Sequence, residues 1–243
     1  MKATLMYSSV KQQNLETAKT AGKSIEIAAF DFDGTCIRGN SPVLLVRQLV
    51  ARHMLPASVV ARIGAWGAAY KFRLPQNEAW VRGLVFRAFA GMPVSEVDAF
   101  LQDFYFQHVD KLFRPQALAE MERLHNQGVK IVAVTATFEP IITACMQVRP
   151  IDFQVSTKMR KAADGTYMCE VDGKPVEGEE KMVQLKRFAN AKWGSGAWEL
   201  KCAYGDHHSD RSMLGSAAHA FAVNPDKPLL RTAQKCGYSV LEW

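Results

Sequence analysis

Residues 25–35 read IEIAAFDFDGT, an apolar run that ends in two carboxylates, Asp31 and Asp33, only two residues apart. Such a run is typical of a buried strand, and open α/β sheets bind their ligands at the carboxyl ends of strands. Two like charges this close resist joint ionisation and burial unless a cation or a proton is shared between them. The stretch therefore predicts an α/β fold with a functional acidic site at the end of its first strand.

A second acidic cluster lies far downstream, where residues 205–210 read GDHHSD directly after another apolar run. Asp206 and Asp210 are four residues apart where strand gives way to helix, a spacing that can put both on one side of a metal ion. With Asp31 they would supply the sparse set of carboxylates that Mg²⁺ prefers. Together the two clusters predict a Mg²⁺-dependent phosphoryl-transfer site.

The rest of the chain alternates short apolar strands with amphipathic helices. We predict strands at 25–30, 129–134, 201–204, 220–223 and 239–241, with helices at 139–147, 179–191 and 228–236 between some of them. Strands that alternate with helices indicate a parallel sheet covered on both faces.

A long helical interruption separates the first two predicted strands. Apolar residues there recur at helical spacing, and Pro42, Pro56, Pro75 and Pro93 fit the starts of successive helices. The boundaries that we expect are 41–112 for an inserted helical cap subdomain, 25–40 with 113–243 for the core, and 1–24 for a poorly ordered N-terminal extension. A smaller insertion at 153–176 contains Asp164-Gly165 and is predicted to form a hairpin.

Composition narrows the class of protein. The formal net charge of +6 comes from scattered residues, which suits a surface that steers a small phosphorylated substrate, and no nucleic-acid partner is expected. The five cysteines are widely spaced without a CxxC pair, which favours reduced thiols in a cytoplasmic protein. Adjacent His207 and His208 splay apart, which argues against zinc. No uncharged apolar run reaches the length of a membrane span.

Residues from three segments fit the chemistry of phosphoryl transfer. Asp31 could attack phosphorus once the charge on the phosphate is neutralised, and Asp33 could protonate the leaving alkoxide and then activate water. Thr135 offers a hydroxyl and free amides before a helix, while Thr137, nearer the helix start, is the stronger N-cap candidate. Lys181 lies near a helix N-terminus, where a cation is unfavourable, so neutralising Asp31 is a plausible task for it.

In this order, residues 31–35, Thr135, Lys181 and Gly205-Asp206 with Asp210 resemble the four motifs of the haloacid dehalogenase superfamily. The helical insertion resembles the cap of its phosphoserine phosphatase-like branch (subfamily IB). The resemblance implies a Rossmann-like, doubly wound, mostly parallel sheet and an aspartyl-phosphate mechanism with Mg²⁺. The roles that it implies are nucleophile and metal ligand for Asp31, acid/base and metal ligand through its carbonyl for Asp33, phosphoryl binding for Thr135, charge neutralisation for Lys181, and metal binding for Asp206 and Asp210.

Four residues are expected to contact the substrate: Gly34, Thr35, Ala136 and Asn40. Asn40 stands where the phosphoserine phosphatases of the branch carry a glutamate that holds the substrate's ammonium group. A neutral amide cannot replace that charge, so we expect another phosphomonoester, either a small metabolite or a lipid-derived phosphate. The alternatives are a phosphotransferase or mutase with the same residues, and a catalytically silent protein that binds a phosphate ligand or nucleic acid. The intact acids argue against the silent protein, because a pure binder has no need of Asp33.

Overall fold

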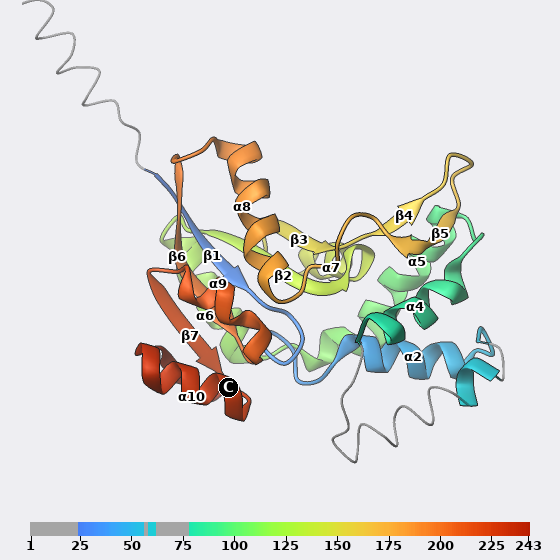
Figure 1. Cartoon of the computed structure of the whole chain (residues 1–243), viewed down its shortest axis with the longest axis horizontal. Helices are drawn as coiled ribbons and strands as arrows, with labels where there is room; N and C mark the ends of the chain where they lie inside the picture. Colours follow the sequence, from blue (N-terminus) through green and yellow to red (C-terminus); the bar gives the residue numbers. More distant parts are fainter. Residues whose placement is uncertain (1–23, 56–57, 62–77) are drawn as a thin grey trace, which may run out of the picture.

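The computed structural model describes residues 24–55, 58–61 and 78–243, and a six-stranded parallel sheet forms its centre (Figure 1). The strands in their order across the sheet are β3 (Phe153–Thr157), β2 (Lys130–Phe138), β1 (Ile25–Phe30), β6 (Trp198–Gly205), β7 (His219–Val223) and β8 (Ser239–Leu241). The chain moves from β1 first to one side and later to the other, which confirms the predicted doubly wound α/β fold.

Helices cover both faces of the sheet, because alternate residues of a strand point to opposite sides. Ala28 and Phe30 of β1 join one hydrophobic cluster, and Ile27 and Ala29 join the other. The first cluster includes residues of α6 (Pro115–Asn126) and α7 (Glu139–Met146). The second includes residues of α8 (Glu179–Trp193), α9 (Arg211–Gly215) and α10 (Lys227–Cys236).

The largest differences from the predicted bounds lie in β2, β6 and the smaller insertion. β2 runs on to Phe138 instead of ending at Val134, and β6 begins at Trp198 instead of Lys201. Phe153–Thr157, which we assigned to the smaller insertion, is the edge strand β3 of the main sheet. Its own residues do not show that it pairs with β2, because that pairing joins distant parts of the sequence.

Helices α2 (Ser41–Ala51), α4 (Glu78–Phe89) and α5 (Val94–Phe104) lie between β1 and β2 in the sequence and gather on one side of the sheet (Figure 1). A π-helical turn (Tyr105–Val109) and a 3-10 turn (Asp110–Leu112) follow. Pro42 and Pro93 mark helix starts as predicted, whereas Pro56 and Pro75 lie outside the described residues.

The two connections between this inserted segment and the sheet lie side by side. The Arg38 N–H donates to the Leu112 carbonyl and the Arg114 N–H donates to the Cys36 carbonyl, each at 2.8 Å. The inserted helices share a single hydrophobic cluster with one face of the sheet. The segment therefore enters and leaves the core at one place, next to the end of β1.

The predicted hairpin is present, over a shorter range. β4 (Met159–Lys161) and β5 (Tyr167–Val171) pair antiparallel around Asp164-Gly165. The hairpin is bonded to the inserted segment: the Gly91 N–H donates to the Tyr167 carbonyl at 2.8 Å, and the Tyr167 hydroxyl donates to Asp98 at 2.6 Å.

Among the described helices, none combines the length and apolar character that a bilayer crossing requires. The expectation of a poorly ordered N-terminal extension falls on residues 1–23, outside the described part of the chain, and on Ser24.

Candidate functional site

Parallel strand pairing brings the predicted acidic residues to one edge of the sheet. Phe30 of β1 pairs with Ala133 of β2 on one side and with Tyr204 of β6 on the other. The Asp31 N–H then donates to the Tyr204 carbonyl at 2.9 Å. The residues just past these strand ends, Asp31 and Asp206 among them, therefore meet although they are far apart in the sequence.

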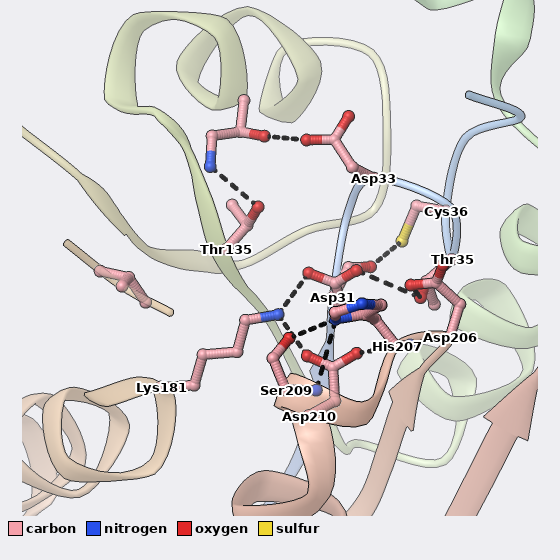
Figure 2. A network of polar contacts seen from close by, with 12 residues as sticks. Asp31, Asp33, Thr35, Cys36, Thr135, Lys181, Asp206, His207, Ser209 and Asp210 are labelled. Carbon is pink, nitrogen blue, oxygen red and sulfur yellow. Dashed lines mark hydrogen bonds and ion pairs between the residues drawn. The ribbon is translucent and has the colours of Figure 1, made fainter. Parts of the chain in front are cut away.

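Three carboxylates and one ammonium form the centre of the site (Figure 2). Asp31, Asp206 and Asp210 each offer an oxygen, and these oxygens lie within 4.8 Å of one another. Lys181 Nζ is 2.6 Å from Asp31 Oδ1 and 2.6 Å from Asp210 Oδ1. Asp31, Lys181 and Asp210 are all buried, and Asp210 is completely so. One cation does not balance three carboxylates, so the cluster carries excess negative charge in a place that water hardly reaches.

Burial and the neighbouring charges shift the pKa values of Asp31, Asp206 and Lys181. Burial, followed by repulsion from Asp210 and Asp206, raises the pKa of Asp31 well above its ordinary range despite the attraction of Lys181. Burial and then Asp210 raise the pKa of Asp206 to about 6. Burial alone would lower the pKa of Lys181, but its contacts with Asp31 and Asp210 outweigh that effect and raise it. The ammonium stays charged, and Asp31 and Asp206 favour a proton or a further cation.

Backbone geometry at two glycines allows the cluster to close. Gly34 has φ +82°, and a Cβ there would lie 2.1 Å from Asp206 Oδ2. A Cβ at Gly205 would lie 2.6 Å from Asp210 Oδ2. The buried Thr35 hydroxyl lies 3.3 Å from Asp31 Oδ2 and 3.2 Å from Asp206 Oδ1 and can donate to either. The turn after β1 therefore packs directly against the carboxylates that follow β6.

Asp33 lies apart from the other three carboxylates, as Figure 2 shows. Its carboxylate accepts hydrogen bonds from the Ser41 N–H at 2.5 Å and the Ser41 hydroxyl at 3.0 Å, and from the Thr137 hydroxyl. Burial raises its pKa, although these three hydrogen bonds oppose the shift. A raised pKa suits a group that must give a proton and later accept one.

Thr135, at the end of β2, is buried and its hydroxyl oxygen accepts from the Thr137 N–H at 3.1 Å. Ala136 between them is half-buried. The prediction that Thr137 caps the following helix is wrong. The N-cap of α7 is Phe138, without a side-chain capping bond, because β2 runs on through Thr137 and turns its hydroxyl toward Asp33.

Asn40 is not brought into the cluster. It is exposed, and its side-chain oxygen accepts from the Val43 N–H at 3.0 Å, which makes it the N-cap of α2. The next residue, Ser41, was not predicted as a site residue. A serine before Pro42 signals a helix start, but nothing local indicates a contact with Asp33.

The donor set suits a hard cation. All three converging groups offer carboxylate oxygens, which Mg²⁺ accepts together with water and substrate oxygens. His207 and His208 face Asp226 instead, with His208 Nδ1 at 2.9 Å and His207 Nε2 at 3.5 Å from Asp226 Oδ2. This second group is partly exposed, and Asp226 also caps α10 by accepting from the Leu229 N–H.

Sequence comparison relates the chain to a family of hydrolases. The haloacid dehalogenase-like hydrolase family matches residues 28–215. Protein CicA of Caulobacter vibrioides is 27% identical over 193 residues, which cover 79% of this chain and 82% of that protein. Phosphoserine phosphatase SerB1 of Mycobacterium tuberculosis is 26% identical over 224 residues, covering 89% and 70%. A histidinol-phosphatase of Neisseria meningitidis is 22% identical over 219 residues, covering 89% and 98%.

Solved structures share the fold. A protein of unknown function from Bordetella pertussis Tohama I superposes with a TM-score of 0.78 at 20% identity, covering 90% of this chain and 99% of that one. A substrate-bound phosphoserine phosphatase superposes with a TM-score of 0.61 at 16% identity, covering 90% and 93%. With the family match over most of the chain and the acidic cluster at the strand ends, the chain belongs to the haloacid dehalogenase-like hydrolase family, in its phosphoserine phosphatase-like branch.

Proposed function

We propose that the chain is a Mg²⁺-dependent phosphatase that hydrolyses a phosphomonoester through an aspartyl-phosphate on Asp31. The observation that carries the proposal is the contact of Lys181 Nζ with Asp31 and Asp210, 2.6 Å in each case, beside a third carboxylate from Asp206. The lysine holds the nucleophile in place, and the uncompensated charge gives the site capacity for a divalent cation.

Asp31, Asp206 and Asp210 would hold Mg²⁺, with the backbone carbonyl of Asp33 as a further oxygen. When bound, Mg²⁺ offsets the negative charge of the phosphate and the carboxylates, so that an anionic nucleophile can approach phosphorus. The completely buried Asp210 also contacts Lys181, which keeps its carboxylate in a fixed orientation.

In the first step, an Asp31 carboxylate oxygen bonds to phosphorus while the bond from phosphorus to the leaving oxygen breaks. Asp33 donates its proton to that leaving oxygen, and the free alcohol departs. Lys181, the Thr135 hydroxyl and the Ala136 amide stabilise the phosphoryl oxygens. Gly34 and Thr35 keep the turn after β1 close to the phosphate.

In the second step, the ionised Asp33 takes a proton from water as the water oxygen bonds to phosphorus. The bond between phosphorus and Asp31 breaks, inorganic phosphate leaves, and the protonated Asp33 and the free Asp31 carboxylate are regenerated. A substrate hydroxyl in place of water would give the phosphotransferase or mutase reaction with the same residues.

We propose that residues 41–112 act as a cap that closes over the site and controls the access of water. Two contacts support this role: Arg82 of α4 pairs with Glu177, just before α8, and Ser41 of α2 contacts Asp33.

Asn40 is neutral and already caps α2, so we propose that the substrate is a small or lipid-derived phosphomonoester other than phosphoserine. We also propose a cytoplasmic location, which the five free cysteines support.

The test is phosphate release from para-nitrophenyl phosphate, phosphoserine and histidinol phosphate by the wild type and Asp31→Asn, in Mg²⁺ and in EDTA. We expect hydrolysis of the aryl ester only with Mg²⁺ and an intact Asp31. When alcohols are added to the same assay, the phosphoryl group should still be transferred to water. Efficient transfer of the phosphoryl group to an alcohol would indicate a phosphotransferase. If no phosphomonoester is hydrolysed while phosphate ligands or nucleic acid still bind, the chain is a silent binding protein.

A further inference from the structure

The carboxyl group of Asp33 is held from two sides by buried hydroxyls. The Ser41 hydroxyl donates to Asp33 Oδ2 at 3.0 Å, the Thr137 hydroxyl donates to the same oxygen, and the Ser41 N–H donates to Oδ1 at 2.5 Å. Ser41 is 0% exposed and Thr137 is 2% exposed. Both carboxyl oxygens of Asp33 are therefore fixed by donors that solvent does not replace.

The two hydroxyls can also accommodate a change of proton on Asp33. Ser41 Oγ and Thr137 Oγ1 lie 3.2 Å apart, and either can donate to the other. When Asp33 is ionised, both hydroxyls can point to it, and when it is protonated, one of them can turn to its neighbour. The carboxyl group can thus give and regain a proton without a movement of heavy atoms.

The donors come from different parts of the fold. Ser41 is the first residue of α2 in the inserted segment, whereas Thr137 lies in β2 of the core, two residues after Thr135. Asp33 therefore lies at the junction of the two parts. Its orientation depends on β2 and also on the first turn of α2 remaining against the core.

We propose that Ser41 and Thr137 are positioning residues that hold Asp33 where it can protonate the leaving group, and that Ser41 makes this hold depend on the docking of α2. The inference rests on the proposed phosphatase function. A general acid must stand within hydrogen-bond reach of the atom that it protonates, and such catalysis contributes about 10²–10⁴-fold to rate. Loss of one hydroxyl removes one of the two side-chain donors to Asp33 Oδ2, holds the carboxyl group less firmly and forfeits part of that factor.

The test compares two substrates of similar shape that differ in their need for an acid. The leaving group of phenyl phosphate must be protonated, whereas that of 2,4-dinitrophenyl phosphate departs as a stable anion. The quantity measured is kcat/KM, which covers the reaction up to departure of the leaving group and excludes the later hydrolysis of the aspartyl-phosphate.

The test variants are Ser41→Ala and Thr137→Val, each of which removes one hydroxyl. Asp33→Asn shows the largest effect that loss of the acid can have, and Thr137→Ser restores a hydroxyl at position 137. We expect kcat/KM for phenyl phosphate to fall by about 10–100-fold in the first two, part of the general-acid factor, and to change little for the dinitrophenyl ester. Thr137→Ser should recover most of the loss. Thr157→Val is the matched control, because Thr157 is equally buried but its hydroxyl accepts from the Val176 N–H, away from Asp33.

Equal losses on both esters, or no loss on phenyl phosphate, would overturn the inference. If Thr137→Val fails to fold, Ser41→Ala, which removes the other hydroxyl donor to Asp33 Oδ2, still decides the matter. The phosphatase function is tested separately: the wild type should hydrolyse the dinitrophenyl ester, and Asp31→Asn should not. Uniform losses in an active enzyme would therefore refute the positioning role alone, whereas a wild type inactive on both esters would refute both proposals.

Discussion

Replacing Asp206 by asparagine is expected to stabilise the metal-free protein at neutral pH and to weaken its response to Mg²⁺. Burial, and then repulsion by Asp210, raise the pKa of Asp206 from its ordinary 3.8 to about 6. One pKa unit corresponds to about 1.4 kcal/mol, so a shift of roughly two units costs the folded state about 3 kcal/mol. Asparagine keeps an oxygen for the Thr35 hydroxyl, which lies 3.2 Å from Asp206 Oδ1, and removes the charge.

The sign of the pH dependence follows from the raised pKa. Because the folded protein binds this proton more tightly than the unfolded chain, the cost is absent below 3.8 and develops as the pH rises to about 6. In EDTA, Asp206→Asn should exceed the wild type by up to about 3 kcal/mol in free energy of unfolding near pH 7, and by little near pH 4. A ligand at a hundred times its Kd stabilises the folded protein by about 2.7 kcal/mol. Asp206→Asn removes one of the three carboxylates proposed to hold Mg²⁺, so the same Mg²⁺ concentration should stabilise the wild type more than the variant.

Urea unfolding followed by circular dichroism, at both pH values and with Mg²⁺ or EDTA, measures these differences. Asp226→Asn is the contrasting control. Although burial opposes it, hydrogen bonds from His208 and the Leu229 N–H hold the pKa of Asp226 below its ordinary value, so this substitution should destabilise near neutral pH. A wild type more stable than Asp206→Asn in EDTA near pH 7, or equal stabilisation of both by Mg²⁺, would refute the electrostatic argument.

Two further substitutions probe the buried lysine and the turn after β1. Lys181→Met keeps most of the side-chain volume but leaves Asp31 and Asp210 without their cation, so urea unfolding in EDTA should show a loss of about 3–5 kcal/mol; an unchanged stability would mean that the ion pairs do not hold the site together. Gly34→Ala adds a Cβ at φ +82° and 2.1 Å from Asp206 Oδ2, so we expect it to lose stability and to bind Mg²⁺ more weakly by calorimetry. Gly165→Ala is the control, because Gly165 has the same φ but no atom lies within 4 Å of the added Cβ. Equal losses of stability in the two variants would mean that backbone strain of about 1–3 kcal/mol accounts for both and that the close approach to Asp206 contributes nothing.

The central strands and the charged residues were readable from the sequence because their signals are local. The apolar run 25–30 followed by Asp31 marked β1 and its ligand-binding end, and the run before Asp206 did the same for β6. The strand-helix alternation then required a parallel sheet, and the sheet brings these ends together. Lys181 stood out because its charge is misplaced for a helix N-terminus.

The errors lie where distant contacts decide the role of a side chain. Thr137 has the residue type and position of an N-cap, but β2 continues through it to Phe138, which pairs with Thr157 of β3, and its hydroxyl contacts Asp33, 104 residues away in the sequence. Asn40 is different: its side chain caps α2, and its contact with the substrate stays a prediction. The edge strand β3 is short and partly polar, and its pairing with β2 could not be read from its own residues.

The most direct test of the proposed mechanism is to identify the residue that carries phosphate during turnover. The wild type is mixed with an aryl phosphate and Mg²⁺, quenched in acid, reduced with borohydride to trap the acyl phosphate as homoserine, and digested for mass spectrometry. The proposed mechanism predicts reduction at position 31 alone, and none in EDTA or in Asp31→Asn. Hydrolysis that proceeds without modification of Asp31, or that persists in Asp31→Asn, would contradict it.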